Sequence, residues 1–397
     1  MQETYSYVMA TPYTIAKSRT GGVISRLLSQ VDLEFVGAQM IAPDEDFVRE
    51  YADSLRKQSQ ENLNSGAKLL SDYVLENLAP SEGRKHRILI LIFKGIDPCK
   101  KLSDICGPLF PENRNIESIS GETIRDTYAD LILSPKAPKK IVYFEPAVLT
   151  PRGQNLADEN LRQFARFLKT CGNLVENIQY PDPSKIEKTL VIIKPDNWQY
   201  ASSKPGTIID MFSRTGLRIV GIKVHRFTQK EALEFYGPVE INLKEKLGPV
   251  FGQKAREVLE KEFRLPLSKE IEKTLSDSFG TEYAREQFRM IIEFMSGRKP
   301  GICLPEEEDK PGNVKCMIII YEGENAIKKI RDVLGPTDPL KAPGGTIRRE
   351  VGSNVMVNTA HASDSNESYE RESRIVKVNE NTLGSSLAEY LKTRPNV

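Results

Sequence analysis

The chain has 397 residues, of which 39% are hydrophobic and 28% charged, and 56 basic side chains nearly balance 55 acidic ones. This length predicts two or three domains of an ordinary globular protein. A net charge of +1 provides no field that would attract nucleic acid or an anionic membrane, so neither is expected as a partner. No apolar run is long enough to cross a bilayer, and the N-terminus lacks a basic region followed by an apolar one.

The cysteines indicate the compartment. There are five, an odd number, and none belongs to a CxxC pair. We therefore expect free thiols in a reducing compartment, a cytoplasmic protein, and no zinc site.

The first predicted element is an apolar strand at 7–13 that contains a proline near its end. A glycine-bearing turn and an amphipathic helix follow, in which Val23, Leu27 and Leu28 fall on one face. A second strand is predicted from residue 33 to 37.

The same order of elements returns in the second half of the chain. The strand at 190–196 also contains a proline, and the following helix places Ile208, Met211 and Phe212 on one face. The next strand ends at Gly221, and the spacing from Gly206 to Gly221 equals that from Gly22 to Gly37.

Later segments of the two halves match as well. Residues 90–108 correspond to residues 318–336 without a gap, and residues 121–125 correspond to residues 344–348. Three collinear matches indicate a duplicated domain. Strands that alternate with helices in each copy predict an α+β fold with two ferredoxin-like α/β sandwich domains and mainly antiparallel sheets.

The predicted domain boundaries follow from the duplication. The first domain is expected at 1–150 and the second at 188–397, with a helical linker at 151–187 between them. Within the linker, apolar residues at helical spacing predict an amphipathic helix, and the prolines at 181 and 183 break the chain after it.

One of only three histidines lies near the C-terminus, among the small and polar residues of 358–365. With an unperturbed pKa near 6.5, the imidazole of His361 is available as a nucleophile at about pH 7. Taken alone, this octapeptide is more typical of a solvated loop beside an Asx-type turn than of a catalytic site.

Further motifs precede His361 in a fixed order. They are Ile193-Lys194-Pro195-Asp196, Tyr321-Glu322-Gly323, Leu334-Gly335-Pro336-Thr337 and Gly344-Gly345-Thr346-Ile347-Arg348. With them, residues 188–375 resemble a nucleoside diphosphate kinase. The resemblance implies a ping-pong phosphotransferase that uses nucleoside triphosphates and diphosphates, with Mg²⁺ bound through the nucleotide phosphates and no metal site made by the protein.

The same resemblance implies the roles of individual residues. His361 would be the catalytic nucleophile, and Ser363 and Glu372 would support and orient it. Seven residues are expected to bind the nucleotide: Lys194, Tyr236, Phe288, Arg331, Thr337, Arg348 and Asn358. They would do so through positive charge, a hydroxyl that donates to phosphate, a contact with the sugar, or stacking on the base. Tyr236 is also compatible with an aromatic residue at the edge of the core, and Glu372 with an exposed helical residue.

The second copy departs from the family pattern in three places. An insertion at about 239–286 is predicted to add two helices to the part of the family fold that closes over the nucleotide. An acidic segment at 305–312 is predicted to be an exposed loop, and Ala362 stands where the family usually has glycine.

The first copy has lost most of the motif residues. Thr11, Ser103 and Leu109 occupy the positions of Lys194, Arg331 and Thr337, and residues 140–150 contain no histidine. Arg125 alone matches its counterpart, Arg348. We therefore expect the first domain to be a degenerate, catalytically silent copy.

Four questions stay open at the level of sequence. The alternative function is a non-catalytic nucleotide-binding or regulatory interaction module on the same fold, with the insertion recruiting a partner. Transfer to protein histidines would use the same intermediate, and base preference cannot be read from these motifs. The two copies are compatible with an intramolecular pseudo-dimer or with a homo-oligomer.

Overall fold

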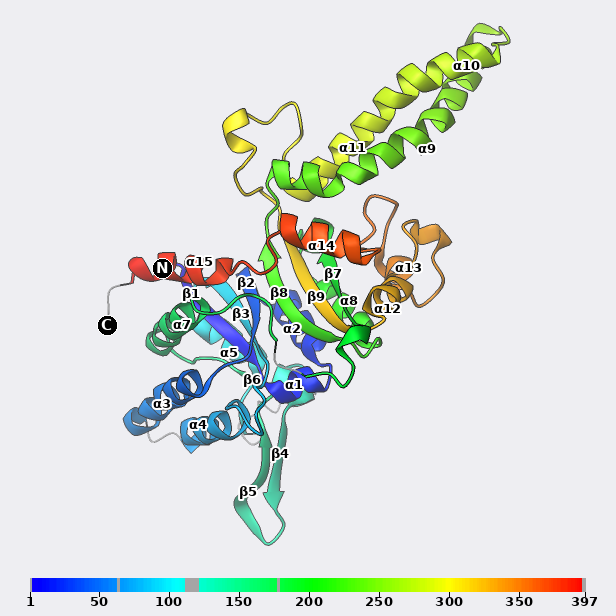
Figure 1. Ribbon diagram of the computed structural model, residues 1–397. Coiled ribbons are helices and arrows are strands. Elements are labelled where there is room, and N and C mark those ends of the chain that lie inside the picture. Colours follow the sequence, from blue (N-terminus) through cyan, green and yellow to red (C-terminus); the bar gives the residue numbers. More distant parts are fainter. Residues whose placement is uncertain (1, 63–64, 111–120, 177–178, 395–397) are drawn as a thin grey trace. The chain divides into compact units, whose positions relative to one another are not determined.

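The computed structural model describes residues 2–62, 65–110, 121–176 and 179–394 (Figure 1), so residues 177 and 178 of the predicted linker lie outside it. The chain forms two compact units. One runs to Val224 and also contains Met317–Glu370 and the chain from Lys377, and the other consists of His225–Cys316 and Arg371–Val376. Within the described ranges, no helix is both long enough and apolar enough to cross a membrane.

Two four-stranded sheets with the same strand order form the first unit. In the first copy the order is β2 (Glu34–Ile41), β3 (Ile88–Gly95), β1 (Thr4–Ala10) and β6 (Val148–Leu149). In the second it is β8 (Arg218–His225), β9 (Cys316–Glu324), β7 (Ile186–Ile193) and β10 (Ala360–Ala362). All three neighbouring pairs of the first sheet, and the pairs β7–β9 and β7–β10 of the second, are antiparallel. This order confirms the predicted α+β fold of two ferredoxin-like sandwiches.

Helices cover both faces of the first sheet because its strands are apolar on both sides. Val8 points into one core with α2 (Thr20–Gln30), α5 (Pro98–Cys106) and α6 (Ile124–Tyr128). Its neighbour Tyr7 points into a second core, as expected for the two-residue period of a strand. The helices of the second core are α3 (Glu45–Asn62), α4 (Ser65–Asn77) and α7 (Gln154–Leu168). The helix predicted in the linker is thus α7, and it packs on the first copy.

The remaining short elements of the first copy lie near the ends of its sheet strands in the sequence. Helix α1 follows β1, and a two-stranded hairpin precedes β6; their bounds are α1 Pro12–Ala16, β4 Asp130–Ser134 and β5 Ala137–Glu145.

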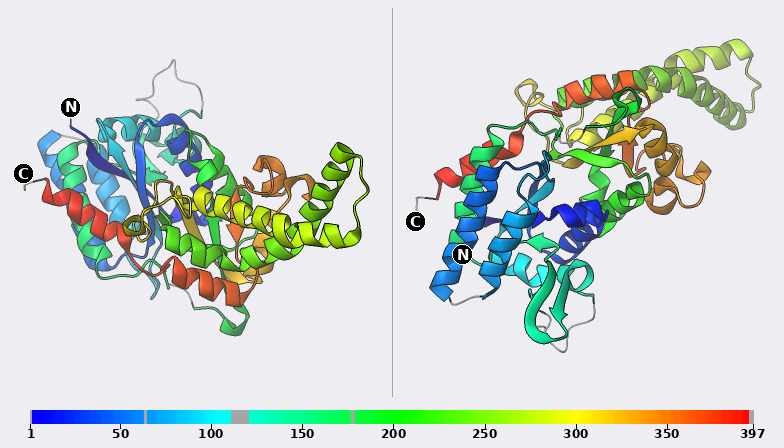
Figure 2. Two further views of the ribbon diagram at one scale, coloured as in Figure 1. Left: turned by 90° about the horizontal axis from the view of Figure 1, so that it is seen from above. Right: turned by 60° about the horizontal axis from the view of Figure 1, so that its bottom comes forward.

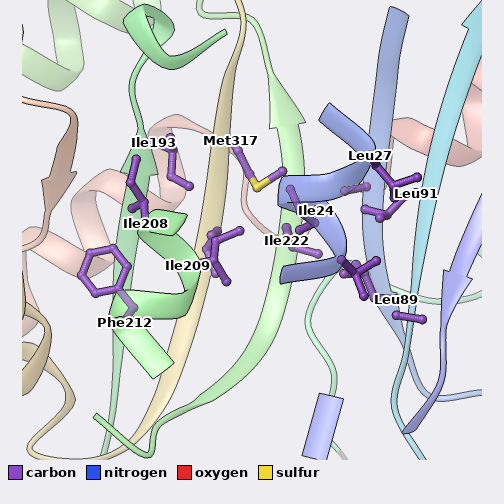
Figure 3. Packing of buried hydrophobic residues seen from close by; sticks show 14 of the residues in the cluster. Ile24, Leu27, Leu89, Leu91, Ile193, Ile208, Ile209, Phe212, Ile222 and Met317 are labelled. Atoms are coloured by element: carbon purple, nitrogen blue, oxygen red, sulfur yellow. The ribbon is translucent and has the colours of Figure 1, made fainter. Parts of the chain in front are cut away.

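The two copies share one hydrophobic core, which forms where α2 packs against α8 (Lys204–Ser213). Figure 3 shows Ile24 and Leu27 of α2 and Ile208, Ile209 and Phe212 of α8 in this core. The helices approach closely because each has a glycine at the crossing. A Cβ atom at Gly206 would lie 2.2 Å from the carbonyl oxygen of Gly21.

Matching residues of the two copies also share unusual backbone angles. Asp97 and Asn325 are left-handed, with φ of 51° and 53°, and precede α5 and α12 (Ala326–Leu334) respectively. Gly107 and Gly335 follow those helices with φ of 83° and 84°, values that favour glycine. The duplication therefore extends to local backbone geometry.

The C-terminal helix α15 (Thr382–Lys392) returns to the first copy and packs along α7, as both views in Figure 2 show. The Tyr390 ring stacks on Tyr5 of β1 with centroids 4.1 Å apart, and its hydroxyl donates to Asp158 of α7 (3.1 Å). Arg394 also reaches Asp158, at 3.0 Å. These contacts connect the end of the chain to the first copy.

We expect Leu387→Ala to lower the free energy of unfolding by about 2–5 kcal/mol, because the Leu387 side chain is fully buried beside α7. Urea denaturation followed by circular dichroism measures the change. Lys392→Ala is the matched control in the same helix, since Lys392 forms only an exposed ion pair with Glu389 and should change stability by less than about 0.5 kcal/mol. Equal stability of the two variants would contradict the docking of α15.

A long helical hairpin dominates the second unit. Its first arm, α9 (Gln229–Phe263), has 35 residues and begins with a capping box between Thr228 and Glu231. The return arm is α10 (Lys269–Leu275), a π-helical turn at Ser276–Gly280, and α11 (Thr281–Ser296). The arms cross closely at Gly252, where a Cβ atom would lie 1.9 Å from Ser276 Oγ.

The insertion expected at about 239–286 falls within this hairpin, and its bounds stay a prediction. Helix α9 begins ten residues before position 239 and continues through Pro238 and Pro249. A proline inside a helix would ordinarily kink or break it. Three apolar residues of α9, Val250, Val258 and Phe263, are exposed to between 57% and 70%. The acidic segment that follows holds the short helix Pro305–Glu307 and is largely exposed.

Candidate active site

His361 lies at the centre of β10, where it pairs with Ile192 of β7. Ala360 and Ala362 on either side point into the shared core, so the His361 side chain lies on the opposite face of the sheet. Before the strand, Thr359 adopts a positive φ of 78°, and its carbonyl accepts the N–H of Lys194 (3.0 Å). The turn thus places Lys194 and His361 on adjacent strand ends.

Lys194 is held by Asn358. The ammonium donates to Asn358 Oδ1 at 2.7 Å and to the Met356 carbonyl at 3.4 Å, and the Asn358 amide nitrogen donates to the Val355 carbonyl at 2.6 Å. Lys194 is 9% exposed and Asn358 is 2% exposed. In this geometry Asn358 positions the lysine, while the sugar contact expected for Asn358 stays a prediction.

Burial gives Lys194 unusual acidity. Removal from water, followed by the positive charge of Arg348, lowers the pKa of Lys194 to about 7, although Asp196 opposes this shift. Burial also raises the pKa of Asp196, and neither carboxylate oxygen of Asp196 has a hydrogen-bond partner in the described part of the chain. The site therefore contains a lysine that would gain a proton and stability from an incoming anion.

Arg348 connects the turn after α12 to β10. It lies in α13 (Ile347–Val351) and donates to the carbonyls of Gly335 (2.8 Å) and Ala360 (2.9 Å). Arg125 of the first copy makes the same pair of bonds, to Gly107 and Val148. The survival of Arg125 in the first copy is thus explained by the backbone it joins, without any ligand.

Arg331 and Thr337 are both exposed, at the end of α12 and in the turn that follows it, before the short helix Pro339–Lys341. The Ser368 hydroxyl is the main cause of the low pKa of Asp364, and the nearby Arg331 and His361 side chains lower it further. Arg331, Asp364 and His361 are therefore neighbours, and Ser363 beside them is fully buried and donates its N–H to Leu190 (3.0 Å).

The other three predicted site residues belong to the helical unit. Tyr236 of α9 and Phe288 of α11 are each 6% exposed, and Glu372 of α14 (Asn366–Ile375) is 3% exposed. The neighbouring Arg371 donates to Glu372 (3.4 Å) and to the carbonyl of Phe235 (3.0 Å). The roles expected for Tyr236, Phe288 and Glu372 stay predictions.

Two polar residues of the site were not identified from the sequence. Asn197, in the short helix Pro195–Asn197, is 2% exposed, and its amide donates to the carbonyls of Lys194 (3.1 Å) and Thr359 (2.9 Å). It fixes the turn that carries Lys194. Asp364 is the second, beside Arg331 and His361. A signal for Asn197 was its place directly after the Lys194-Pro195-Asp196 motif.

The equivalent place in the first copy has different chemistry. Thr11 follows β1 and donates its N–H to Ala147, which has a positive φ of 61°, as Lys194 does to Thr359. By the same register Leu149, paired with Met9, takes the place of His361, and it is buried in the second core. Glu145 fills the adjoining space.

Glu145 is enclosed by hydrogen-bond donors. Its carboxylate accepts from Tyr73 Oη (2.6 Å), Thr11 Oγ1 (2.9 Å) and the Ala147 N–H (3.0 Å). Burial raises its pKa despite these bonds. The first copy therefore has a carboxylate beside Thr11, at the place where the second copy has Lys194. A carboxylate there would repel a phosphate.

The fold and this cluster define a duplicated ferredoxin-like protein with a cluster of lysine, arginine and histidine side chains in its second copy. The family model described as nucleoside diphosphate kinase matches residues 187–246 and 307–381. A nucleoside diphosphate kinase of Staphylothermus marinus is 30% identical over 190 residues, which are 48% of this chain and 92% of that protein. One of Hyperthermus butylicus is 29% identical over 199 residues, 50% of this chain and 97% of the relative.

A solved structure of an NDP kinase from Pyrobaculum aerophilum is 28% identical, covering 49% of this chain and 100% of its own, with a TM-score of 0.33. The chain belongs to the nucleoside diphosphate kinase family, in a tandem arrangement. Residues 247–306, which include Phe288, fall between the two segments matched by the family model.

Proposed function

We propose that the second copy is a nucleoside diphosphate kinase that transfers the γ-phosphate of a nucleoside triphosphate through a phosphohistidine on His361. The observation that carries this proposal is the buried Lys194 held by Asn358 (2.7 Å) on the strand end next to His361. Burying a lysine ammonium destabilises the fold. The presence of such a lysine beside a nucleophile therefore favours a role in binding an anion.

In the first half-reaction a neutral nitrogen of His361 attacks the γ-phosphorus. The P–N bond forms as the bond from phosphorus to the bridging oxygen breaks, and the nucleoside diphosphate leaves with that electron pair. In the second half-reaction a terminal oxygen of the acceptor diphosphate attacks the phosphohistidine, and the P–N bond breaks. Lys194 and Arg331 supply positive charge to the phosphoryl oxygens, and the Thr337 hydroxyl donates to phosphate.

The residues around Lys194 are compatible with Mg²⁺ that is held mainly by the nucleotide. Among the described residues, no group of three or more His, Cys, Asp or Glu side chains could form a metal site. Asp196, with two unpartnered carboxylate oxygens, offers a single hard ligand, and Mg²⁺ commonly takes one or two carboxylates with phosphates and waters. When bound, the ion would neutralise charge on the phosphates.

We also propose that the first copy is catalytically silent and acts as a scaffold. Leu149 stands in the place of the nucleophile, and Glu145 repels the anion that Lys194 would attract. Helices α3, α4 and α7 cover the sheet face on which Leu149 lies. One catalytic centre per chain follows from these replacements.

Radiolabelling of the wild-type chain tests the proposal. Mixing with ATP labelled at the γ-phosphate and Mg²⁺ should give an acid-labile label at close to one phosphate per chain, and GDP should remove it as labelled GTP. A folded protein that takes up no label would leave the non-catalytic nucleotide-binding or regulatory module instead. A label that resists diphosphates but passes to a protein histidine would favour the protein-kinase activity.

The lowered pKa of Lys194 predicts a pH dependence of catalysis. The charged form binds phosphate, so kcat/KM should fall as the pH rises through about 7 in the free enzyme. Bound nucleotide raises the pKa of the lysine, so kcat at saturation should fall only at higher pH. Lys194→Met should lower kcat/KM by about 100-fold or more and remove this dependence.

The same substitution should stabilise the fold. Because the folded-state pKa lies below the unfolded value near 10.5, the unfolded chain binds more protons between about pH 7 and pH 10.5. The penalty for burying Lys194 is therefore complete below pH 7 and declines as the pH rises. Lys194→Met should raise the free energy of unfolding by about 1–3 kcal/mol near pH 6 and leave it unchanged near pH 10. The Asn358 side chain, which loses its partner in this variant, reduces the gain. Lys328→Met, at a side chain that is 77% exposed, is the control.

A further inference from the structure

A cavity of about 280 Å³ opens at the junction of the two copies, away from the β7–β10 site. The first copy contributes Ser18, Thr20 and Arg87, and the second contributes Ser213, Arg218 and Tyr321. Ile15, Ile209 and Leu217 supply apolar walls. No residue proposed above for phosphoryl transfer lines this cavity.

Two arginines, one from each copy, line this cavity. Arg87 donates one N–H to the Ile219 carbonyl (2.6 Å), while the side chain of Arg218 has no hydrogen bond or ion pair within the described ranges. Burial and then the charge of Arg218 lower the pKa of Arg87 to about 10. The lowering shows that the two guanidinium groups are close enough to repel each other.

Two acidic groups lie near this cavity, Glu322 beside the arginines and Asp210 beside Tyr321, and within the described residues neither forms an ion pair with Arg87 or Arg218. Glu322 acts weakly on Arg87, but its carboxylate accepts from Tyr180 Oη (2.7 Å) and lies 3.7 Å from Lys188. Two like charges in a partly buried cavity are stabilised most readily by an anion between them, and guanidinium groups match the geometry of phosphate oxygens.

The Tyr321 hydroxyl is the second, independent feature. Tyr321 is 1% exposed, and its oxygen has no hydrogen-bond partner in the residues that the structure describes. An unpaired buried hydroxyl destabilises a fold by about 1–3 kcal/mol. The corresponding residue in the first copy is Phe93, also fully buried on its strand, so the strand packs without this hydroxyl. A buried hydroxyl without a partner in the described part of the protein indicates that a bound ligand supplies the partner.

We propose that this cavity binds a small phosphate monoester, with Arg218 and Arg87 on the phosphate oxygens, the Tyr321 hydroxyl as a further donor, and the apolar walls around the organic group. The cavity volume of about 280 Å³ lies just below the range of about 300–1,000 Å³ that is typical of pockets for drug-sized ligands, so it suits a small ligand. Both copies contribute ligands, so occupancy would strengthen their contact. The proposal does not rest on the function proposed for His361.

Calorimetric titration of the full chain with phenyl phosphate tests this site. The titrations use a Lys194→Met background, so that the β7–β10 site does not report phosphate. Adding Tyr321→Phe should raise Kd about fivefold or more, and adding Arg218→Gln about tenfold or more. Tyr321→Phe reproduces the residue of the first copy and should fold normally, as circular dichroism will show.

Tyr200→Phe is the matched control, because Tyr200 is 83% exposed and outside the cavity. It should leave Kd unchanged. A site of this kind should bind phenyl phosphate with a Kd of roughly 1 mM. Absence of binding at about 10 mM phenyl phosphate would therefore overturn the proposal. So would a Kd that neither Tyr321→Phe nor Arg218→Gln alters.

Discussion

Replacing His361 with glutamine should lower phosphoryl transfer from ATP to GDP by more than about 1,000-fold, because an amide cannot carry the phosphoryl group. Glutamine approximates the size of histidine, and the position is only partly buried between two core alanines, so the fold should survive. Nucleotide should still bind, since Lys194, Arg331 and Arg348 are unchanged. The effect should therefore appear in kcat, with little change in the Kd for ATP.

A coupled assay for kcat and equilibrium dialysis with labelled ATP separate these quantities. His86→Gln is the matched control, because within the described residues the His86 imidazole forms a hydrogen bond to the Ser81 hydroxyl (2.8 Å) of the first copy and to no other group. It should retain full activity. Should His361→Gln transfer phosphate at the wild-type rate, His361 would not be the carrier, whatever the affinity for nucleotide.

The fold was predictable because the duplication appears in residues that the backbone requires. Gly107 and Gly335 adopt the same left-handed angle after equivalent helices, and both approach a threonine, at Thr123 and Thr346. A substitution at either glycine would be strained whatever its surroundings. Such positions keep their spacing in the sequence even where the chemistry of one copy has been lost.

The arrangement of the site depended on contacts that local sequence does not specify. Asn358 is 164 residues from Lys194, and only folding of β7 against β10 brings the amide to the ammonium. The return of α15 to α7 was not predicted for the same reason: its partner Asp158 is 232 residues from Tyr390. The apolar residues of α9 predicted a helix correctly but not which of them would be buried, because period alone does not identify a partner.

Gly206→Ala should lower the free energy of unfolding by about 1–3 kcal/mol, although alanine favours a helix over glycine by about 1 kcal/mol. The new Cβ would lie 2.2 Å from the Gly21 carbonyl oxygen and 2.4 Å from the Ser25 amide nitrogen. Both are backbone atoms of α2, so no side-chain rotation relieves the overlap, and the two helices must separate. Gly344→Ala is the control, since nothing lies within 4 Å of a Cβ there, and it should change stability by no more than about 1 kcal/mol, in the stabilising direction.

Trp198 is the only tryptophan, and its ring stacks on Phe35 of the first copy with centroids 5.9 Å apart. Its fluorescence during urea denaturation therefore reports separation of the two copies. Gly21→Ala should have a similar effect, because its Cβ would lie 2.3 Å from the Gly206 carbonyl oxygen. Once one substitution has moved the helices apart, the second meets less resistance, so the double variant should lose less stability than the sum of the two. Additive losses would show that the glycines act independently and that α2 and α8 do not meet at this crossing in solution.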